Sequence, residues 1–235
     1  MRRRFSLAGR TRGIISRQRA LMIFKEAFRK AIHLCCAFVP FMLSANYTAT
    51  MITLMVLLVL YSISEFIRLK GIHVPVISTI TEAAARKRDE NRFVLGPVTL
   101  VCGIFLCACI WKSLPATIGI YALAFGDGLA SLSGKMFGRV HIPFTGGKTV
   151  AGSLTCFTAI FISCFLACLA SDSFVRVDVC AVSLIVASVG MTIELLPLKD
   201  FDNILIPLVL AGLIVFLAGC MIYLKSIHYI RNTWN

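Results

Sequence analysis

A glycine-rich segment in the middle of the chain carries an aspartate inside an apolar stretch. The segment reads Gly126-Asp127-Gly128-Leu129-Ala130-Ser131-Leu132-Ser133-Gly134-Lys135-Met136-Phe137-Gly138-Arg139. A carboxylate near the centre of a bilayer costs about 2.5–3.5 kcal/mol on insertion scales, so a functional role is favoured over a tolerated acid. The natural role is a hard oxygen ligand for Mg²⁺, which binds through one or two carboxylates plus substrate phosphates. We therefore predict Asp127 as a catalytic and metal-binding residue.

Small residues recur at every fourth position of the same segment. They are Gly126, Ala130, Gly134 and Gly138, and on a helix they form one face. A ligand or a neighbouring helix can approach the backbone along such a face, and close helix packing of this kind is common in membranes. Packing alone does not explain the neighbouring Asp127.

A second polar segment opens a later apolar stretch. It reads Gly146-Gly147-Lys148-Thr149-Val150-Ala151-Gly152-Ser153. The spacing excludes a P-loop, because position 142 is Ile142 where the motif needs glycine. A helix N-terminus with free N–H groups and its positive dipole end still suits a phosphate. The structural alternative is N-capping of the helix by Thr145 or Thr149.

Two smaller charged clusters flank these segments. Glu26, Arg29, Lys30 and His33 stand at i, i+3, i+4 and i+7, which is one face of a helix. They fit either a functional face or ordinary interface charges with an i,i+3 pair. Glu194, Asp200, Asp202 and Asn203 lie close together near the C-terminus. This second cluster is a candidate for Mg²⁺ binding or for a general base.

Composition places these residues in a membrane protein. The chain has 235 residues, of which 58% are hydrophobic and 15% charged, whereas soluble domains carry about 25% charged residues. The apolar residues come in blocks of about 20, the length that spans a bilayer. This excludes a soluble enzyme and a disordered chain. We predict an all-α fold, a polytopic membrane helix bundle of seven transmembrane helices at 28–45, 49–69, 93–112, 114–134, 149–171, 179–197 and 204–224.

The basic residues predict the orientation of the bundle. Residues 1–27 form a basic cytoplasmic tail and interfacial helix, and residues 28–235 form a single transmembrane catalytic domain. Arg29 and Lys30 shorten the first apolar span, and their side chains are expected to snorkel to the interface. Alternate links carry 20 Lys and Arg against 4 on the other side, which predicts a cytoplasmic N-terminus. Orientation rather than nucleic-acid binding therefore explains the net charge of +13.

Most acidic residues also gather on the predicted cytoplasmic side. Nine of the eleven lie there, all except Asp172 and Asp178. A transporter distributes polar groups through the membrane depth or to both mouths. One-sided polarity instead favours an enzyme that acts on a lipid at the cytoplasmic face, with a water-soluble co-substrate.

These segments together resemble the membrane family of CTP-dependent lipid-alcohol kinases, which includes dolichol, phytol and farnesol kinases and the CTP-dependent diacylglycerol kinase. The family's E-x-x-R-K-x-x-H start is met by Glu26, Arg29, Lys30 and His33. Its G-D-x-x-A-x-x-x-G-x-x-x-G block is met from Gly126 to Gly138, and its K-T-x-x-G-S element by Lys148, Thr149, Gly152 and Ser153. A later D-N with a following proline is met by Asp202, Asn203 and Pro207. The resemblance covers nearly the whole chain from Glu26 onward.

The resemblance implies transfer of the γ-phosphoryl group of CTP to a membrane lipid alcohol, a polyprenol, a phytol-like alcohol or diacylglycerol, with Mg²⁺ as cofactor. Asp127 with Asp202 and Asn203 would hold Mg²⁺, and Glu194 or Asp200 would be the general base. The implied nucleotide-binding residues are Gly126, Gly134, Gly138, Arg139, Lys148, Thr149, Gly152, Ser153, Arg29, Lys30 and His33. The lipid would enter between spans beside the small-residue face. The sequence leaves the oligomeric state open.

Phosphatidate cytidylyltransferase, which makes CDP-diacylglycerol from CTP and phosphatidate, is the alternative. It is distantly similar and shares the aspartate-to-glycine block and a K-T-x-x-G element. Its usual C-terminal signature, a glycine–histidine–glycine run with D-R-x-D, does not follow Lys199-Asp200 here. That difference favours the kinase.

Overall fold

A computed structural model describes residues 23–72, 92–171 and 176–233 of the chain. Within these ranges the regular elements are helices, apart from one isolated antiparallel bridge between His141 and Thr149. The predicted all-α fold class is therefore confirmed. Residues 1–22 lie outside the described residues, and the predicted domain boundary at residue 27 stays a prediction.

The helices follow one another with short links. The first helix covers residues 23–35. It is followed by the 3₁₀ turn η1 (Cys36–Phe38) and then by α2 (Val39–Ala45). The next are α3 (Tyr47–Leu69), α5 (Leu95–Ile110) and α6 (Leu114–Tyr121), which leads through a π-helix, η3 (Ala122–Asp127), into α7 (Gly128–Phe137). The last are α8 (Val150–Ala170), α9 (Arg176–Leu195) and α10 (Asp202–Thr233).

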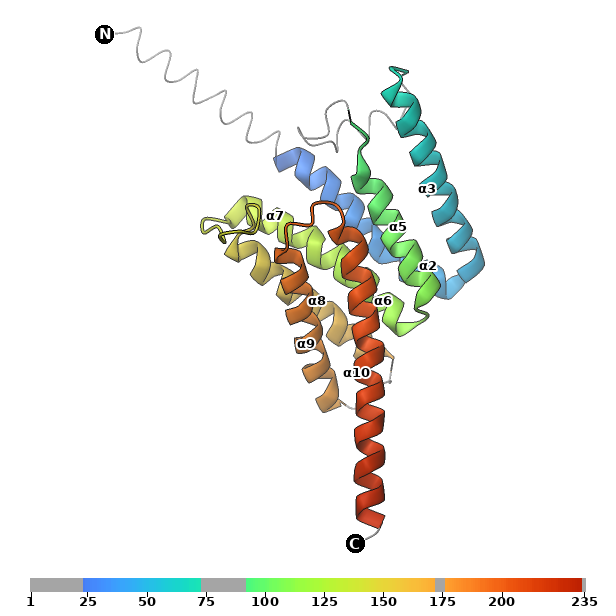
Figure 1. Ribbon diagram of the computed structural model, residues 1–235, viewed down its shortest axis with the longest axis vertical. Coiled ribbons are helices and arrows are strands. Elements are labelled where there is room, and N and C mark those ends of the chain that lie inside the picture. Colours follow the sequence, from blue (N-terminus) through green and yellow to red (C-terminus); the bar gives the residue numbers. More distant parts are fainter. Residues whose placement is uncertain (1–22, 73–91, 172–175, 234–235) are drawn as a thin grey trace, which may run out of the picture.

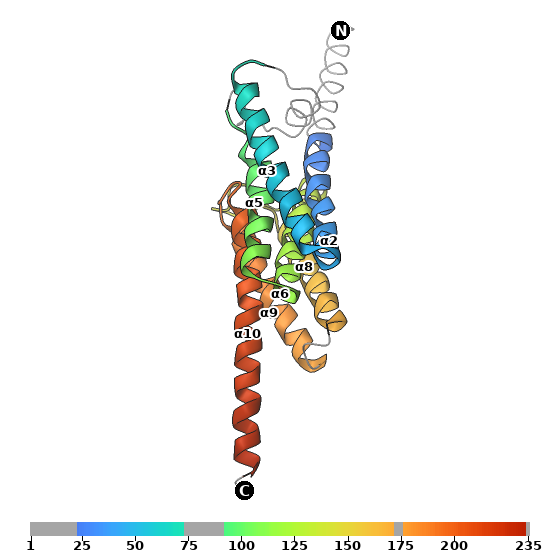
Figure 2. The same cartoon turned by 90° about the vertical axis from the view of Figure 1, so that its right-hand side faces the viewer.

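In the described part of the chain, six helical segments are long and apolar enough to cross a membrane: Ile23–Ala45, Tyr47–Leu69, Leu114–Phe137, Val150–Ala170, Asp178–Leu195 and Asp202–Leu224. The predicted span 93–112 is the shorter apolar helix Leu95–Ile110. Its 16 residues rise about 24 Å, less than the roughly 30 Å of a bilayer's hydrocarbon core. The chain is a polytopic helical bundle, and α10 extends beyond the other helices in both views (Figures 1 and 2). The side of the membrane on which the N-terminus lies stays a prediction.

The segment Leu114–Phe137 lies at the centre of the bundle and is the most buried of the candidate spans. Glycines let its neighbours approach closely, as small residues do in membrane helices. A Cβ atom on Gly119 would lie 2.4 Å from the Pro207 carbonyl oxygen in α10, and one on Gly126 would lie 2.7 Å from Ile160 Cγ1 in α8. In α5, a Cβ atom on Gly103 would lie 2.2 Å from the Asn203 carbonyl oxygen. These contacts fix the spacing of α5, α8 and α10 around the central segment.

A buried carboxylate ties α3 to the start of α5. Glu65 is fully buried, and its Oε1 accepts a hydrogen bond of 2.8 Å from the Val94 N–H. Arg68 donates to both Glu65 oxygens, at 2.8 and 2.7 Å. This pair joins two helices at the end of the bundle where the polar residues gather.

Candidate active site

A cavity of about 710 Å³ lies at one end of the bundle. Its wall is built by the first helix, the start of α5, α7, the link from α7 to α8, the start of α8 and the link from α9 to α10. Fourteen of the sixteen predicted site residues line it; Gly126 and Arg139 do not. The fold thus brings together motifs that are widely separated in the sequence.

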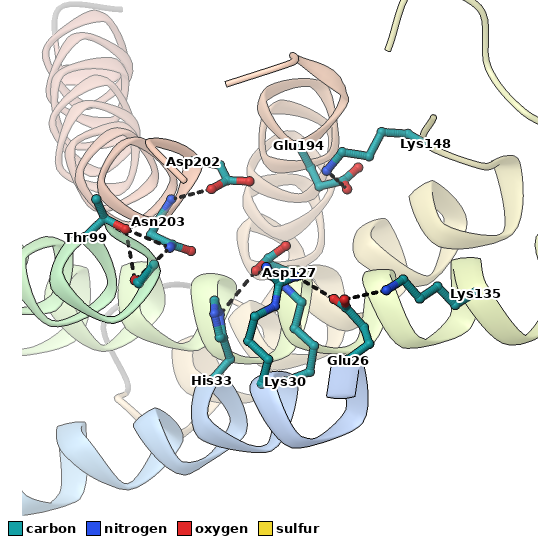
Figure 3. Close-up of polar contacts among 12 residues, drawn as sticks. Glu26, Lys30, His33, Thr99, Asp127, Lys135, Lys148, Glu194, Asp202 and Asn203 are labelled. Atoms are coloured by element: carbon teal, nitrogen blue, oxygen red, sulfur yellow. Dashed lines mark hydrogen bonds and ion pairs between the residues drawn. The ribbon is translucent and has the colours of Figure 1, made fainter. Parts of the chain in front are cut away.

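Asp127 is buried at the centre of this cavity's charged groups (Figure 3). The Lys30 ammonium donates a hydrogen bond to Asp127 Oδ2, and His33 Nδ1 lies 3.2 Å from the same oxygen. The expectation that Lys30 snorkels to the interface is wrong, because its side chain is only 2% exposed and ends on this carboxylate. A buried charge needs a partner, and each of these two charges compensates the other.

The π-helix η3 places Asp127, which is its last residue. π-turns are rare, occur mostly as single turns within α-helices, and are frequent at functional sites. Gly126 packs toward Ile160 of α8, while the next residue, Asp127, meets Lys30 of the first helix. The sequence pattern did not predict this change of helix type.

Glu26 links the first helix to α7. Its Oε1 accepts a hydrogen bond of 2.5 Å from Arg29 Nη2, and its Oε2 accepts one of 2.5 Å from Lys135 Nζ. The face that carries Glu26, Lys30 and His33 therefore contacts other helices and is not a set of ordinary interface charges. Lys135 and Ser131 also line the cavity and were missed by the sequence analysis. Ser131 follows Asp127 by four residues and Lys135 by eight. This spacing places both residues on the same helix face as Asp127, and it is the signal that could have identified them.

The small-residue face of α7 packs against α8. A Cβ atom on Gly134 would lie 2.9 Å from Thr149 Oγ1, and one on Gly138 would lie 2.6 Å from the same atom. Gly134 and Gly138 also border the cavity. Gly126 and Arg139 do not line it, and Arg139 is exposed on the surface. α8 therefore covers part of this face, and the expected entry of a lipid beside it stays a prediction.

The start of α8 is capped by its own chain. Thr149 Oγ1 accepts a hydrogen bond of 3.2 Å from the Gly152 N–H, and the Val150 N–H donates to the Val140 carbonyl at 3.1 Å. The N-capping alternative is thus realised at Thr149, and these two amides are not free to bind phosphate as expected. Gly146 and Gly147 precede the cap with φ of +70° and +97°, a region that glycine adopts without steric cost.

Lys148 connects the start of α8 to the end of α9. Its ammonium donates a hydrogen bond to Glu194 Oε1 (Figure 3). Burial lowers the pKa of Lys148, but the Glu194 carboxylate raises it more, so that the pKa lies above its ordinary value. The other Glu194 oxygen, Oε2, is buried and has no hydrogen-bond partner among the described residues.

The link from α9 to α10 completes the cavity wall with Asp200 and Asp202. Asp202 Oδ1 accepts a hydrogen bond of 2.9 Å from the Asn203 N–H. Asn203 Nδ2 donates to Thr99 Oγ1 at 3.0 Å and to the Gly96 carbonyl at 3.4 Å, so this amide joins α10 to α5 (Figure 3). Thr99 is a supporting residue that the sequence analysis missed, because no local pattern connects it to Asn203.

The carboxylates of the cavity do not form a closed metal cage. Among the residues that the structure describes, no group of three or more His, Cys, Asp or Glu could hold a metal ion. Mg²⁺ needs only one or two carboxylates when substrate phosphates supply further oxygens. The oxygen donors of Asp127 and Asp202, which line the same cavity, fit that mode of binding (both are labelled in Figure 3). Magnesium binding stays a prediction.

The fold and this cavity define the class of the molecule: a polytopic membrane protein with a charged site enclosed at one end of its helix bundle. The chain is similar to the chloroplastic farnesol kinase of Arabidopsis thaliana, with 35% identity over 85 residues, 35% of this chain and 27% of the relative. It is 30% identical to the chloroplastic phytol kinase 1 of Arabidopsis thaliana over 151 residues, 60% of this chain and 49% of the relative. A probable phytol kinase 3 of Glycine max is 31% identical over 144 residues, 57% of this chain and 45% of the relative.

These relatives support the resemblance to lipid-alcohol kinases that the motifs indicated. The chain spans about half, or less, of the length of the curated relatives it matches. No model of a known protein family matches the chain. No solved structure matches it either.

Proposed function

We propose that the protein is an integral-membrane kinase that transfers the γ-phosphoryl group of CTP to the hydroxyl of a lipid alcohol. The observation that carries the proposal is the buried Asp127, held between Lys30 and His33 at the base of a charged cavity within an apolar bundle. Such a cavity suits a charged, water-soluble co-substrate that must meet a membrane-bound acceptor. Relatives named phytol kinase and farnesol kinase point to an isoprenoid alcohol as the acceptor.

Charge balance within the cavity supports a role for a metal ion. The described residues of its wall include five cationic side chains, Arg29, Lys30, Lys135, Lys148 and Lys199, and five carboxylates, Glu26, Asp127, Glu194, Asp200 and Asp202. Phosphoryl transfer depends mainly on positioning and on neutralising phosphate charge. The negative charges of the carboxylates balance the positive charges of the lysines and the arginine. When lysines turn toward a triphosphate, carboxylates lose their ion-pair partners and become available to bind a metal ion. Mg²⁺, when bound, would neutralise the charge of the phosphates, and Asp127, Asp202 and Asn203 are the residues proposed to hold it.

The hydroxyl of the acceptor must lose its proton, and Glu194 is the better of the two predicted bases. Its Oε2 is buried and has no hydrogen-bond partner in the described ranges, while Oε1 accepts a hydrogen bond from Lys148. When Lys148 turns toward a phosphate, Glu194 gains freedom to accept the proton. Asp200 lines the same cavity and is the second candidate.

Labelled CTP tests the proposal directly. Membranes that contain the protein are incubated with Mg²⁺, farnesol or phytol, and CTP labelled at either the α- or the γ-phosphorus. A kinase leaves CDP in water, so we expect the γ label in the organic phase and the α label in the aqueous phase. Membranes with the Asp127→Asn variant serve as the control.

Entry of the α label into lipid, with phosphatidate as the acceptor, would contradict the kinase and indicate a cytidylyltransferase. Unlabelled ATP that competes as well as unlabelled CTP would contradict the choice of nucleotide.

A further inference from the structure

A second hollow extends from Leu34, which lies near Gly128, toward Lys112 and Ser171 at the opposite end of the bundle. It has a volume of about 1340 Å³. Three stretches of the chain line it: residues 34–47 of the first two spans, residues 108–125 up to η3, and residues 163–171 of α8. We call this hollow the apolar groove.

The lining of the apolar groove offers little to a polar ligand. Most of its side chains are apolar, and four of its hydroxyl groups are already bonded within their own helices. Ser44 Oγ, Thr117 Oγ1, Ser163 Oγ and Ser171 Oγ donate to the carbonyls of Phe41, Ser113, Ile160 and Cys168, at 2.7, 3.0, 3.2 and 3.0 Å. Trp111 Nε1 in the same lining is buried without a hydrogen-bond partner among the described residues, and Lys112 also lies there. The rest of the surface offers mainly apolar contact, which suits a hydrocarbon chain.

The apolar groove and the charged cavity approach each other at Gly128. His33 and Asp127 line the cavity, whereas their near neighbours in sequence, Leu34 and Phe125, line the groove. A Cβ atom on Gly128 would lie 3.3 Å from Leu34 Cδ2 and 3.8 Å from His33 Cβ. The linings of the two spaces therefore come close to each other at Gly128, the residue that follows Asp127.

The far end of the groove is bounded by polar contacts. Tyr47 donates from its hydroxyl to the Ala108 carbonyl at 3.1 Å, and Lys112 Nζ lies 5.8 Å from the centre of the Tyr47 ring. Between this end and Gly128, the stretch from Leu114 to Phe125 rises about 16 Å along its axis. The groove is thus elongated and lined mostly by apolar side chains, and one end of it lies near Gly128.

We propose that the apolar groove binds the single hydrocarbon chain of an isoprenoid alcohol, with the hydroxyl end at Gly128 beside Asp127 and His33. This rests on the proposed kinase function and adds the site of the acceptor. The acceptor must bring a hydroxyl to a charged cavity while its chain stays in apolar surroundings, and the groove is an apolar space whose lining approaches that cavity at Gly128. The small-residue face of α7 is packed against α8 along part of its length.

Photo-cross-linking tests the site without reference to catalysis. Purified protein in nanodiscs is irradiated with a farnesol analogue that carries a diazirine at the end of its chain, and labelled peptides are mapped by mass spectrometry. We expect labelling within residues 108–125 and 163–171 that unlabelled farnesol removes. Labelling that farnesol does not remove, that lies on other segments, or that only diacylglycerol removes would overturn the proposal.

A matched pair of variants on α8 sharpens the test. Ala167 lines the groove, whereas Leu169 on the same helix lies outside it. Ala167→Phe should remove the competed labelling, and Leu169→Phe should retain it. For phosphorylation, Ala167→Phe should lower kcat/KM at least tenfold for phytol and less than twofold for geraniol, whose shorter chain reaches less of the groove. An equal loss for both alcohols would contradict binding of the chain at this position.

The two readouts separate the two proposals. Competed labelling of the groove by a protein that phosphorylates no alcohol supports the site and overturns the kinase. Phosphorylation of farnesol with labelling elsewhere overturns the site alone.

Discussion

At the scale of single residues, the site depends on the pairing of buried charges. Lys30 and Asp127 are both almost fully buried and bind each other. Removing one partner of such a pair leaves an uncompensated charge, which costs about 3–5 kcal/mol. A variant of either residue therefore affects stability as well as chemistry, and an experiment has to separate the two effects.

Asp127→Asn should lower phosphorylation of a lipid alcohol at least 100-fold, because the amide keeps the shape but removes the charge proposed to bind Mg²⁺. The measurement is transfer of the γ label from CTP, normalised to the protein present in the membrane. Asp178→Asn is the matched control, since Asp178 lies in the first turn of α9 at the opposite end of the bundle; it should stay within twofold of the original activity.

A second variant separates catalysis from folding. The double variant Lys30→Met with Asp127→Asn removes both buried charges, so it should accumulate at least as well as Asp127→Asn alone while remaining inactive. Recovery of activity in the double variant would show that Asp127 serves packing and not phosphoryl transfer.

At the scale of helices, glycine contacts set the positions of the groups that line the cavity. Gly103 of α5 lies directly against the Asn203 carbonyl of α10, and Asn203 in turn bonds Thr99 and Gly96 of α5. The neighbouring Asp202 faces the cavity. The distance between these two helices therefore decides where this carboxylate lies.

Gly103→Ala should destabilise the bundle, because the added methyl group would meet backbone atoms of α10 at 2.2 Å. Overpacking of this kind costs about 1–3 kcal/mol, which corresponds to a fall in Tm of roughly 2–10 °C for a chain of this size. Thermal unfolding of the purified protein in detergent measures the effect.

Gly96→Ala is the control on the same helix, since a Cβ atom there meets nothing within 4 Å. Its Tm should equal or slightly exceed that of the original protein, because alanine favours the helix by up to about 1 kcal/mol over glycine. Equal Tm values for the two variants would contradict the role of the Gly103 contact.

At the scale of the whole molecule, the polar residues occupy one end of the bundle. The start of the first helix, the start of α5 and the links from α7 to α8 and from α9 to α10 all contribute to the charged cavity. The described part of α10 ends far from it, at the opposite end of the molecule (Figure 1). The excess of lysine and arginine on the links at the cavity end predicts that this end faces the cytoplasm.

A topology experiment tests the orientation. A reporter fused after Asn235 should be non-cytoplasmic, and one inserted between Phe144 and Gly146, in the link from α7 to α8, should be cytoplasmic. Activity of alkaline phosphatase and fluorescence of green fluorescent protein at the two positions give the sides. If both reporters indicate the same side, the number of membrane crossings between these two positions is even, and the predicted three crossings by α8, α9 and α10 are wrong.

The sequence by itself predicted the apolar helices and fourteen of the residues that line the cavity. Apolar blocks of bilayer length give helices wherever they occur, because backbone groups in lipid have to bond within the segment. Asp127 could be singled out because a charged side chain is costly in such a block and so is rarely there without a use. Lys148 could be singled out because it precedes the start of a helix, where a phosphate is favoured. These arguments are local and need no knowledge of how the helices pack.

Tertiary structure alone decided which groups meet. From the sequence, the helix face that carries Gly134 could contact either a ligand or another helix. In the structure this face packs against α8. Lys30 binds Asp127 rather than reaching the interface, and Thr149 caps α8 rather than leaving its amides free. The apolar groove arises where three stretches of the chain, distant in sequence, meet. Each of these outcomes depends on the rotation and separation of neighbouring helices, which are set by the contacts of the whole bundle and not by the pattern within any one span.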